Sequence, residues 1–321
     1  MKNQKRKEYK GSMQIRLKEL KFTFKKLIES PLSIAGLALV ITFSAIAILA
    51  PILAPPKMTD PFLIPPPTYY GSTYVREPSP PSPQHPFGTT TWQTDIFYGC
   101  IWGTIHAFRL GIVIVLPLII IGAIIGLIAG YYGGIIDEIL MRITDIVLAF
   151  PSLILIMALI VAFVTIELPF TLTGFKRLDA AVLAIILVGW PGYARLVRSE
   201  VLRVRSEDYV EAARAAGASD LRIIIKHIIP NSIYSIIIVG SLDFGTIVLT
   251  AAALSFLGLG APLGYADWGQ LIYAAMDWVS RGFRYWWTYT FPGLFITLYA
   301  LGWNLLGDAF RDILDPLYRR R

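Results

Sequence analysis

The side chains that most often perform chemistry are scarce and widely separated in this sequence. The sequence contains no GxxxxGK[ST] loop for the phosphates of ATP, no HExxH pair and no nucleophile elbow. Gly258, Gly260 and Gly264 resemble a dinucleotide-binding loop, but the third glycine comes one residue late and apolar sequence surrounds it. We therefore expect no catalytic residue, no cofactor and no metal. The histidines and the single cysteine show no metal-ligand spacing: His85, Cys100, His106 and His227.

A polar stretch at about 198–230 carries more information, because it predicts two short helices separated by a bend. Ser206 is placed to cap the first helix, whose first turn is acidic and so suits the helix dipole. Gly217 is placed to end it, since glycine readily adopts left-handed backbone angles. Ser219 or Asp220 can cap a second helix that ends just before the proline at the end of the stretch.

Small side chains cover the first of these helices. A bent, small-residue element with charged edges suits close approach by another protein. The same spacing also suits an amphipathic hairpin that rests on the protein's own helices, and spacing alone does not choose between the two. The small residues are four alanines: Ala212, Ala213, Ala215 and Ala216.

The composition places this stretch in a membrane protein. Of 321 residues, 55% are hydrophobic and only 16% are charged, whereas a soluble domain carries roughly 25% charged residues. An ordinary soluble enzyme is therefore excluded, as is disorder over most of the length. We predict an all-α integral membrane protein with six transmembrane helices. Six segments are long and apolar enough to span a bilayer, at about 32–53, 110–130, 143–166, 180–197, 232–257 and 289–306.

The lysines and arginines predict the orientation. If the first 31 residues are cytoplasmic, that side of the membrane holds 22 of the 29 basic residues and the other side seven. We therefore expect a multi-pass protein of the cytoplasmic membrane with both termini in the cytoplasm. The excess positive charge then matches anionic membrane lipid, and we expect no nucleic-acid partner. A cleaved signal peptide is the alternative for the first apolar segment, but its basic region and apolar run are both too long.

The segments before and after the first span also have a predicted organisation. Residues 1–31 carry an apolar stripe at helical spacing, which predicts an amphipathic helix on the membrane surface; a solvated basic tail is the alternative. Residues 54–108 form an outer loop that begins rich in proline, which favours a semi-rigid connector over contact with an external partner. Residues 109–321 form a five-helix core. The apolar stripe consists of Met13, Leu17, Leu20, Phe24 and Leu27.

Within the predicted spans, Asp243 is the most unusual residue. A carboxylate near the middle of the bilayer should face the bundle interior, a cavity or a partner. It could line a pathway and contact the amine of a substrate, or make a hydrogen bond between helices. Asp145 is expected to pair with an arginine, such as Arg142 or one from the polar stretch. We also expect close helix packing at Gly122, Gly126 and Gly130, and membrane-interface anchoring by Trp268, Trp278, Trp286 and Trp287.

One motif in the polar stretch resembles a known family. Glu211, Ala212 and Ala213, then three residues, then Gly217, and Pro230 thirteen residues on, resemble the EAA loop of ATP-binding-cassette importer permeases. In that family the loop forms coupling helices that insert into a groove on the ATPase subunit. The resemblance therefore implies that Glu211 makes a polar contact with an ATPase and that Gly217 provides the bend.

The resemblance extends over some 230 residues and is most similar to C-type subunits of dipeptide and oligopeptide permeases. It departs from that family's pattern at 93–95 and 103–108. The matching segments are 85–89, 126–151, 189–195, 227–231, 254–260, 268–269 and 304–316.

The resemblance implies a type I importer and its partners. They are a homologous B-type permease subunit, two ABC ATPase subunits and an extracytoplasmic substrate-binding protein. The implied cargo is di- or oligopeptides, with oligosaccharides or nickel chelates as the alternatives. An ion-driven secondary transporter is the alternative of a different class, but paired broken helices and several intramembrane charges are not evident.

Overall fold

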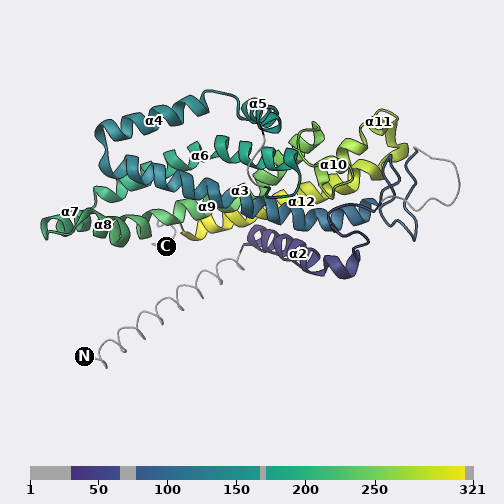
Figure 1. Ribbon diagram of the computed structural model, residues 1–321. Helices are drawn as coiled ribbons and strands as arrows, with labels where there is room; N and C mark the ends of the chain where they lie inside the picture. Colours follow the sequence, from purple (N-terminus) through teal and green to yellow (C-terminus); the bar gives the residue numbers. More distant parts are fainter. Residues whose placement is uncertain (1–29, 66–76, 167–170, 315–321) are drawn as a thin grey trace.

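A computed structural model describes residues 30–65, 77–166 and 171–314, and these are almost entirely helical, with no extended strand (Figure 1). The elements are α2 (Pro31–Leu53), α3 (Ile96–Tyr132), α4 (Gly134–Leu148), α5 (Ser152–Thr165), α6 (Lys176–Arg205), α7 (Asp208–Ala215), α8 (Asp220–Ile223), a π-helical segment (Ile224–Ile228), α9 (Ile229–Phe256), α10 (Trp268–Ala274), α11 (Met276–Val279), a 3₁₀ turn (Gly282–Tyr285) and α12 (Trp287–Leu314). The expected amphipathic helix at 13–27 lies outside the described residues.

The long helices form an elongated bundle (Figure 1). Helix α3 packs along α6 and α9, helix α12 packs against α9 and α2, and α4 and α5 lie against α6. The short helices α7 and α8 project at one end of the bundle, and α10 and α11 lie at the opposite end (Figure 1). The predicted all-α membrane fold is confirmed.

Five helices in the described chain are long and apolar enough to cross a membrane: α2, α3, α6, α12 and the continuous helix Asp220–Phe256. The third predicted span, 143–166, is instead a pair of helices, α4 and α5, bent by 88°. The break falls at Phe150 and Pro151, because proline disfavours helical geometry in the residue before it and ends the hydrogen-bonding pattern. The expected total of six therefore holds only if this bent pair counts as one span.

The second predicted span is much longer than the apolar run that identified it. Helix α3 has 37 residues and is therefore roughly 55 Å long, well beyond a hydrocarbon layer of about 30 Å. It begins at Ile96 because the Asp95 carboxylate accepts hydrogen bonds from the amides of Phe97 and Tyr98. The first turns of α3 therefore belong to the expected outer loop 54–108.

Helices α3 and α6 approach closely where the sequence predicts it. A Cβ atom added at Gly122, Gly126 or Gly130 would lie within 3 Å of α6 atoms, including the backbone of Ala194 and Arg198. Glycine is the only residue that allows this separation, so the prediction of close packing is confirmed. The two helices form a tightly packed pair.

The expectation of four interfacial tryptophans is wrong for three of them. Trp268, Trp278 and Trp287 are buried, and only Trp286 is substantially exposed. The buried rings pack on other aromatic rings, and the Trp268 indole donates to the Cys100 carbonyl at 3.1 Å. The N–H groups of Trp268 and Trp278 have hydrogen-bond partners inside the protein and gain nothing from the membrane interface, whereas Trp287 is removed from it by burial alone.

Candidate functional site

The candidate site is the projecting hairpin, residues 206–228, formed by α7, the turn at Gly217, α8 and the π segment. Gly217 has φ +79°, a left-handed angle that a side chain disfavours. Its amide donates to the Arg214 carbonyl at 3.0 Å, and the amide of Ala218 donates to Ala213 at 3.1 Å, which satisfies the last carbonyls of α7. No atom lies within 4 Å of a Cβ built at this position, so the backbone angle alone requires glycine. The predicted helix end at Gly217 is confirmed.

The predicted cap at the start of α7 is wrong. Ser206 is the last residue of the α6 end, and its hydroxyl donates to the Arg203 carbonyl at 2.8 Å. Glu207 takes the N-cap position, without a side-chain capping bond. The fully buried Val204 and Val210 flank this turn, and their packing fixes where α6 ends and α7 begins.

The second arm of the hairpin does not end before Pro230, contrary to the expectation. The π segment joins α8 directly to α9, so Asp220–Phe256 is one continuous helix. Pro230 lies in the interior of this continuous helix, directly after the π segment, so its missing N–H leaves out one backbone hydrogen bond at the point where the helical geometry changes. Nearby, the Ile229 amide donates to Ile224, and the Asn231 side-chain amide donates to the His227 carbonyl at 2.7 Å. Any movement of this arm therefore carries α9 with it.

The hairpin has one buried face and one exposed face. Val210, Ile223 and Ile228 have no exposed surface and continue the aliphatic core of the bundle. On the other face Glu211 and Ala212 are exposed, and Ala213 is half-buried. The predicted packing on the protein's own helices is thus found on the buried face, and the exposed face is the one available for the predicted docking.

Tyrosine side chains hold the hairpin against itself and against α3. The Tyr131 hydroxyl donates to Asp220 Oδ1 at 2.6 Å, and the Tyr209 ring lies 6.0 Å from the His227 ring. Burial raises the pKa of Tyr209, with Glu207 adding to the shift and Arg203 opposing it. Sequence reasoning missed Tyr131; a hydroxyl at the end of an apolar helix, which needs a hydrogen-bond partner, is the signal that points to it.

Asp243 lies midway along α9 and is hydrogen-bonded to a neighbouring helix. The Tyr193 hydroxyl of α6 donates to Asp243 Oδ2 at 2.6 Å. A Cβ built at Gly240 or Gly245 would lie within 3 Å of α3 and α12 atoms respectively, so α9 is closely packed on both sides of this carboxylate. The geometry matches the interhelical hydrogen bond that the sequence analysis weighed against a pathway role.

Two ion pairs join α4 to α6 near the hairpin end. Asp145 pairs with Arg195, and Asp137 accepts from both Nε and Nη2 of Arg198. The expected partner Arg142 instead lies 3.9 Å from Glu138, one turn away on its own helix. The expected arginine partner is therefore confirmed, but it is Arg195 rather than Arg142, because Asp145 is directed towards α6.

The described residues contain no cluster of three or more His, Cys, Asp or Glu side chains that could hold a metal ion. His106 is buried in α3 with its Nε2 3.6 Å from Asp267 Oδ2, and no third ligand joins them. Burial raises the pKa of Asp267 to about 6. Asp267 also caps α10 by accepting from the Gln270 amide at 2.8 Å, which gives it a structural role.

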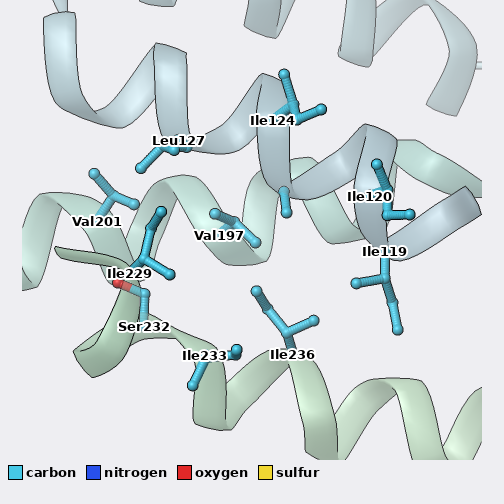
Figure 2. A pocket seen from close by; sticks show the side chains of 11 residues that line it. Ile119, Ile120, Ile124, Leu127, Val197, Val201, Ile229, Ser232, Ile233 and Ile236 are labelled. Carbon is cyan, nitrogen blue, oxygen red and sulfur yellow. The ribbon is translucent and has the colours of Figure 1, made fainter. Parts of the chain in front are cut away.

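An apolar cavity of about 310 Å³, open to the surface on one side, lies between α3, α6 and α9 on the hairpin side of the bundle (Figure 2). Its walls are aliphatic except for Ser232, whose hydroxyl donates to the Ile228 carbonyl. A charged peptide terminus or a cofactor would find no polar partner there. Residues that project into the cavity from the three helices include Ile124, Leu127, Val197, Val201, Ile233 and Ile236 (Figure 2).

Comparison with known proteins gives one family and several relatives. Residues 122–320 match the family described as "Binding-protein-dependent transport system inner membrane component". A dipeptide transport system permease protein of Alkalihalophilus pseudofirmus is 39% identical over 91% of this chain and 88% of its own. An oligopeptide transport system permease protein of Bacillus subtilis is 35% identical over 90% and 87%. A probable D,D-dipeptide transport system permease protein of Escherichia coli is 41% identical over 74% and 75%. The matched region includes the hairpin and Asp243.

Proposed function

Because this chain belongs to the family of binding-protein-dependent transport system inner membrane components, we propose that it is the C-type permease subunit of an ATP-driven importer of di- or oligopeptides. The cargo follows from relatives that are named as dipeptide and oligopeptide permeases and that align over most of both chains. The chain is a transport subunit rather than an enzyme. Since its sequence has no phosphate-binding loop, ATP hydrolysis belongs to a separate polypeptide.

The two-faced hairpin is the observation that carries the coupling role. Its buried face is continuous with the bundle core, and its exposed face presents Glu211, Ala212 and the Gly217 bend. Small side chains let a partner surface approach closely, and the carboxylate offers it a polar contact. The π segment before Pro230 joins the arm to the membrane helix without a break. Because the arm is continuous with α9, a partner that binds the exposed face and moves it also moves α9.

The proposed assembly pairs this chain with a homologous B-type permease, two ABC ATPase subunits and an extracytoplasmic binding protein. The hairpin end faces the cytoplasm, where ATP is available, and both termini lie on that side. The distribution of lysine and arginine supports this orientation. In the assembly, closure of the ATPases pulls on the hairpins and alternates access to a pathway shared by the two permeases.

Affinity purification in mild detergent from the native cells tests this proposal. A second permease and P-loop ATPases should copurify with the native chain and be identified by mass spectrometry. Ala212→Trp should reduce ATPase recovery at least ten-fold, because an indole on the exposed face blocks close approach. Ala149→Trp is the matched control, since Ala149 is an exposed alanine outside the hairpin. Equal ATPase recovery with both variants would contradict the docking role, and a chain that transports without any ATPase would contradict the importer itself.

A further inference from the structure

At the hairpin end, α3 and α6 form one unit by close packing, and the hairpin arm and α9 form another by helix continuity. Helices α3 and α6 pack without space for a Cβ at Gly122, Gly126 or Gly130. The hairpin arm and α9 form one continuous helix from Asp220 to Phe256. The α3–α6 pair is closely packed and the hairpin arm continues into α9, so the contacts between α9 and this pair decide how they move relative to one another.

Between these two bodies the packing is open. The cavity of about 310 Å³ separates Ile120, Ile124 and Leu127 of α3 from Ile229, Ile233 and Ile236 of α9, with Val197 and Val201 of α6 forming the back wall (Figure 2). The space is a groove open to the surface, since Ile120, Ile124 and Ile233 on its rim are exposed, and across it these side chains lack the close atomic contacts that resist sliding in a well-packed core. The apolar contacts in this stretch therefore leave α9 room to shift.

A polar link closes the gap one turn beyond the cavity. Tyr131 is the penultimate residue of α3 and its side chain is buried, with its hydroxyl 2.6 Å from Oδ1 of Asp220. Asp220 is the first residue of α8, and Arg214 of α7 lies beside the same hydroxyl. Arg205 of α6 also reaches the Gly130 carbonyl at 3.4 Å. Both arms of the hairpin and the ends of α3 and α6 thus meet at Tyr131.

We propose that Tyr131 and Asp220 are positioning residues that join the hairpin to the α3–α6 pair, so that hairpin movement displaces these helices together with α9. The inference rests on the proposed coupling function of the hairpin. A hydrogen bond from a hydroxyl to a carboxylate is short and strong. Without it, an ATPase can still hold and move the hairpin, but the cavity absorbs part of the motion and the pathway opens less often in each ATP cycle.

The test uses the complete importer in proteoliposomes, with a radiolabelled dipeptide such as dialanine and phosphate release measured in the same sample. Tyr131→Phe removes only the hydroxyl, and Tyr132→Phe is the matched control on the exposed neighbour. We expect Tyr131→Phe to retain bound ATPase and ATP hydrolysis while dipeptide imported per ATP falls about five-fold. We expect Tyr132→Phe to match the native chain. An unchanged import ratio in Tyr131→Phe, with ATPase bound, would overturn the inference.

The acceptor side gives an independent pair of variants in case Tyr131→Phe fails to assemble. Asp220→Asn keeps an oxygen that accepts from Tyr131, whereas Asp220→Leu does not. We expect Asp220→Asn to retain most of the import ratio and Asp220→Leu to lose about five-fold. Equal amounts of dipeptide imported per ATP by Asp220→Asn and Asp220→Leu would overturn the inference. If no ATPase copurifies with the native chain, the proposed coupling function fails, and this inference fails with it. A variant that binds ATPase and hydrolyses ATP but imports less dipeptide per ATP separates this inference from the coupling function.

Discussion

The end of the bundle that carries α10 and α11 is filled with aromatic rings, whereas the hairpin end is filled with aliphatic side chains around a cavity. In the aromatic cluster, Phe43, Trp268, Phe295 and Tyr299 bring α2, α10 and α12 together with ring centroids 5.4–6.1 Å apart. At the hairpin end, the same role falls to valines and isoleucines, with hydrogen bonds from Tyr131 to Asp220 and from Ser235 to Glu200 beside the cavity.

The difference indicates which end moves. Edge-to-face rings with buried indole hydrogen bonds have few alternative arrangements, because a shift breaks several directional contacts at once. Aliphatic side chains around a void can repack at small cost, since their contacts have no preferred direction. We infer that the aromatic end is the fixed support against which the hairpin end moves, and the predictions below alter either one end or the hydrogen bond that lies between them.

The largest effect is expected from Trp268→Ala in the aromatic cluster. The substitution removes a buried ring that contacts three others and the hydrogen bond from its indole to the Cys100 carbonyl. We expect a loss of about 3–5 kcal/mol of unfolding free energy, measured by thermal unfolding of the purified chain. Trp286→Ala is the control, because Trp286 is exposed. A similar change in both variants would show that the aromatic end is not specially stabilised.

Next in size is the Tyr193–Asp243 hydrogen bond, which lies between the two ends. In a double-mutant cycle of Tyr193→Phe and Asp243→Ala, we expect a coupling energy of roughly 1.5–3 kcal/mol, because the bond is charge-assisted. Uptake should fall in Asp243→Ala while the assembly survives. If Asp243→Ala impairs uptake much more than Tyr193→Phe, the carboxylate also contacts the cargo. Normal uptake in Asp243→Ala would remove it from the transport mechanism.

A smaller effect is expected at the hairpin turn. Gly217→Val places a β-branched side chain at φ +79° and should destabilise the turn by about 1–2 kcal/mol. Hydrogen exchange of the amides in α7 and α8 should therefore speed up, with little change in the aromatic end. Gly217→Asn should be milder, because asparagine tolerates left-handed angles. Identical exchange in the native chain and Gly217→Val would contradict the view that the backbone angle requires glycine.

The smallest effect on stability is expected from filling the cavity. Ala123 lines the void, and Ala123→Leu should raise the unfolding free energy by about 1 kcal/mol while lowering the uptake rate, since a filled void resists movement of α9. The control is Ala38→Leu, at an exposed position on α2. Faster or unchanged uptake in the stabilised Ala123→Leu protein would break the proposed contrast between the two ends.

The sequence predicts the membrane-spanning framework well, because twenty consecutive apolar residues have few other stable environments. It also predicts the helix end at Gly217 and the close packing at Gly126, since both depend on properties that only glycine has. Hydropathy could not predict the sharp bend between α4 and α5, because the average over the segment hides the effect of Pro151 on local geometry.

The features that the sequence did not predict are set by contacts between distant segments. The interior position of Trp268 depends on rings from α2 and α12, and Asp145 faces Arg195 because α4 folds back along α6. Tyr131 and Asp220 are 89 positions apart. Pairings of this kind depend on how the helices pack, and no local pattern in a single sequence encodes them.

The central claim, that the exposed face of the hairpin binds a separate ATPase, is tested most directly by photocrosslinking in native membranes. A photoreactive amino acid at Ala212 samples the exposed face, and one at Ala149 samples an exposed position outside the hairpin. We predict a crosslink from position 212 to a P-loop ATPase, identified by mass spectrometry, and none from position 149. Crosslinks from position 212 only to lipid or to the same chain would contradict the claim that this face binds an ATPase.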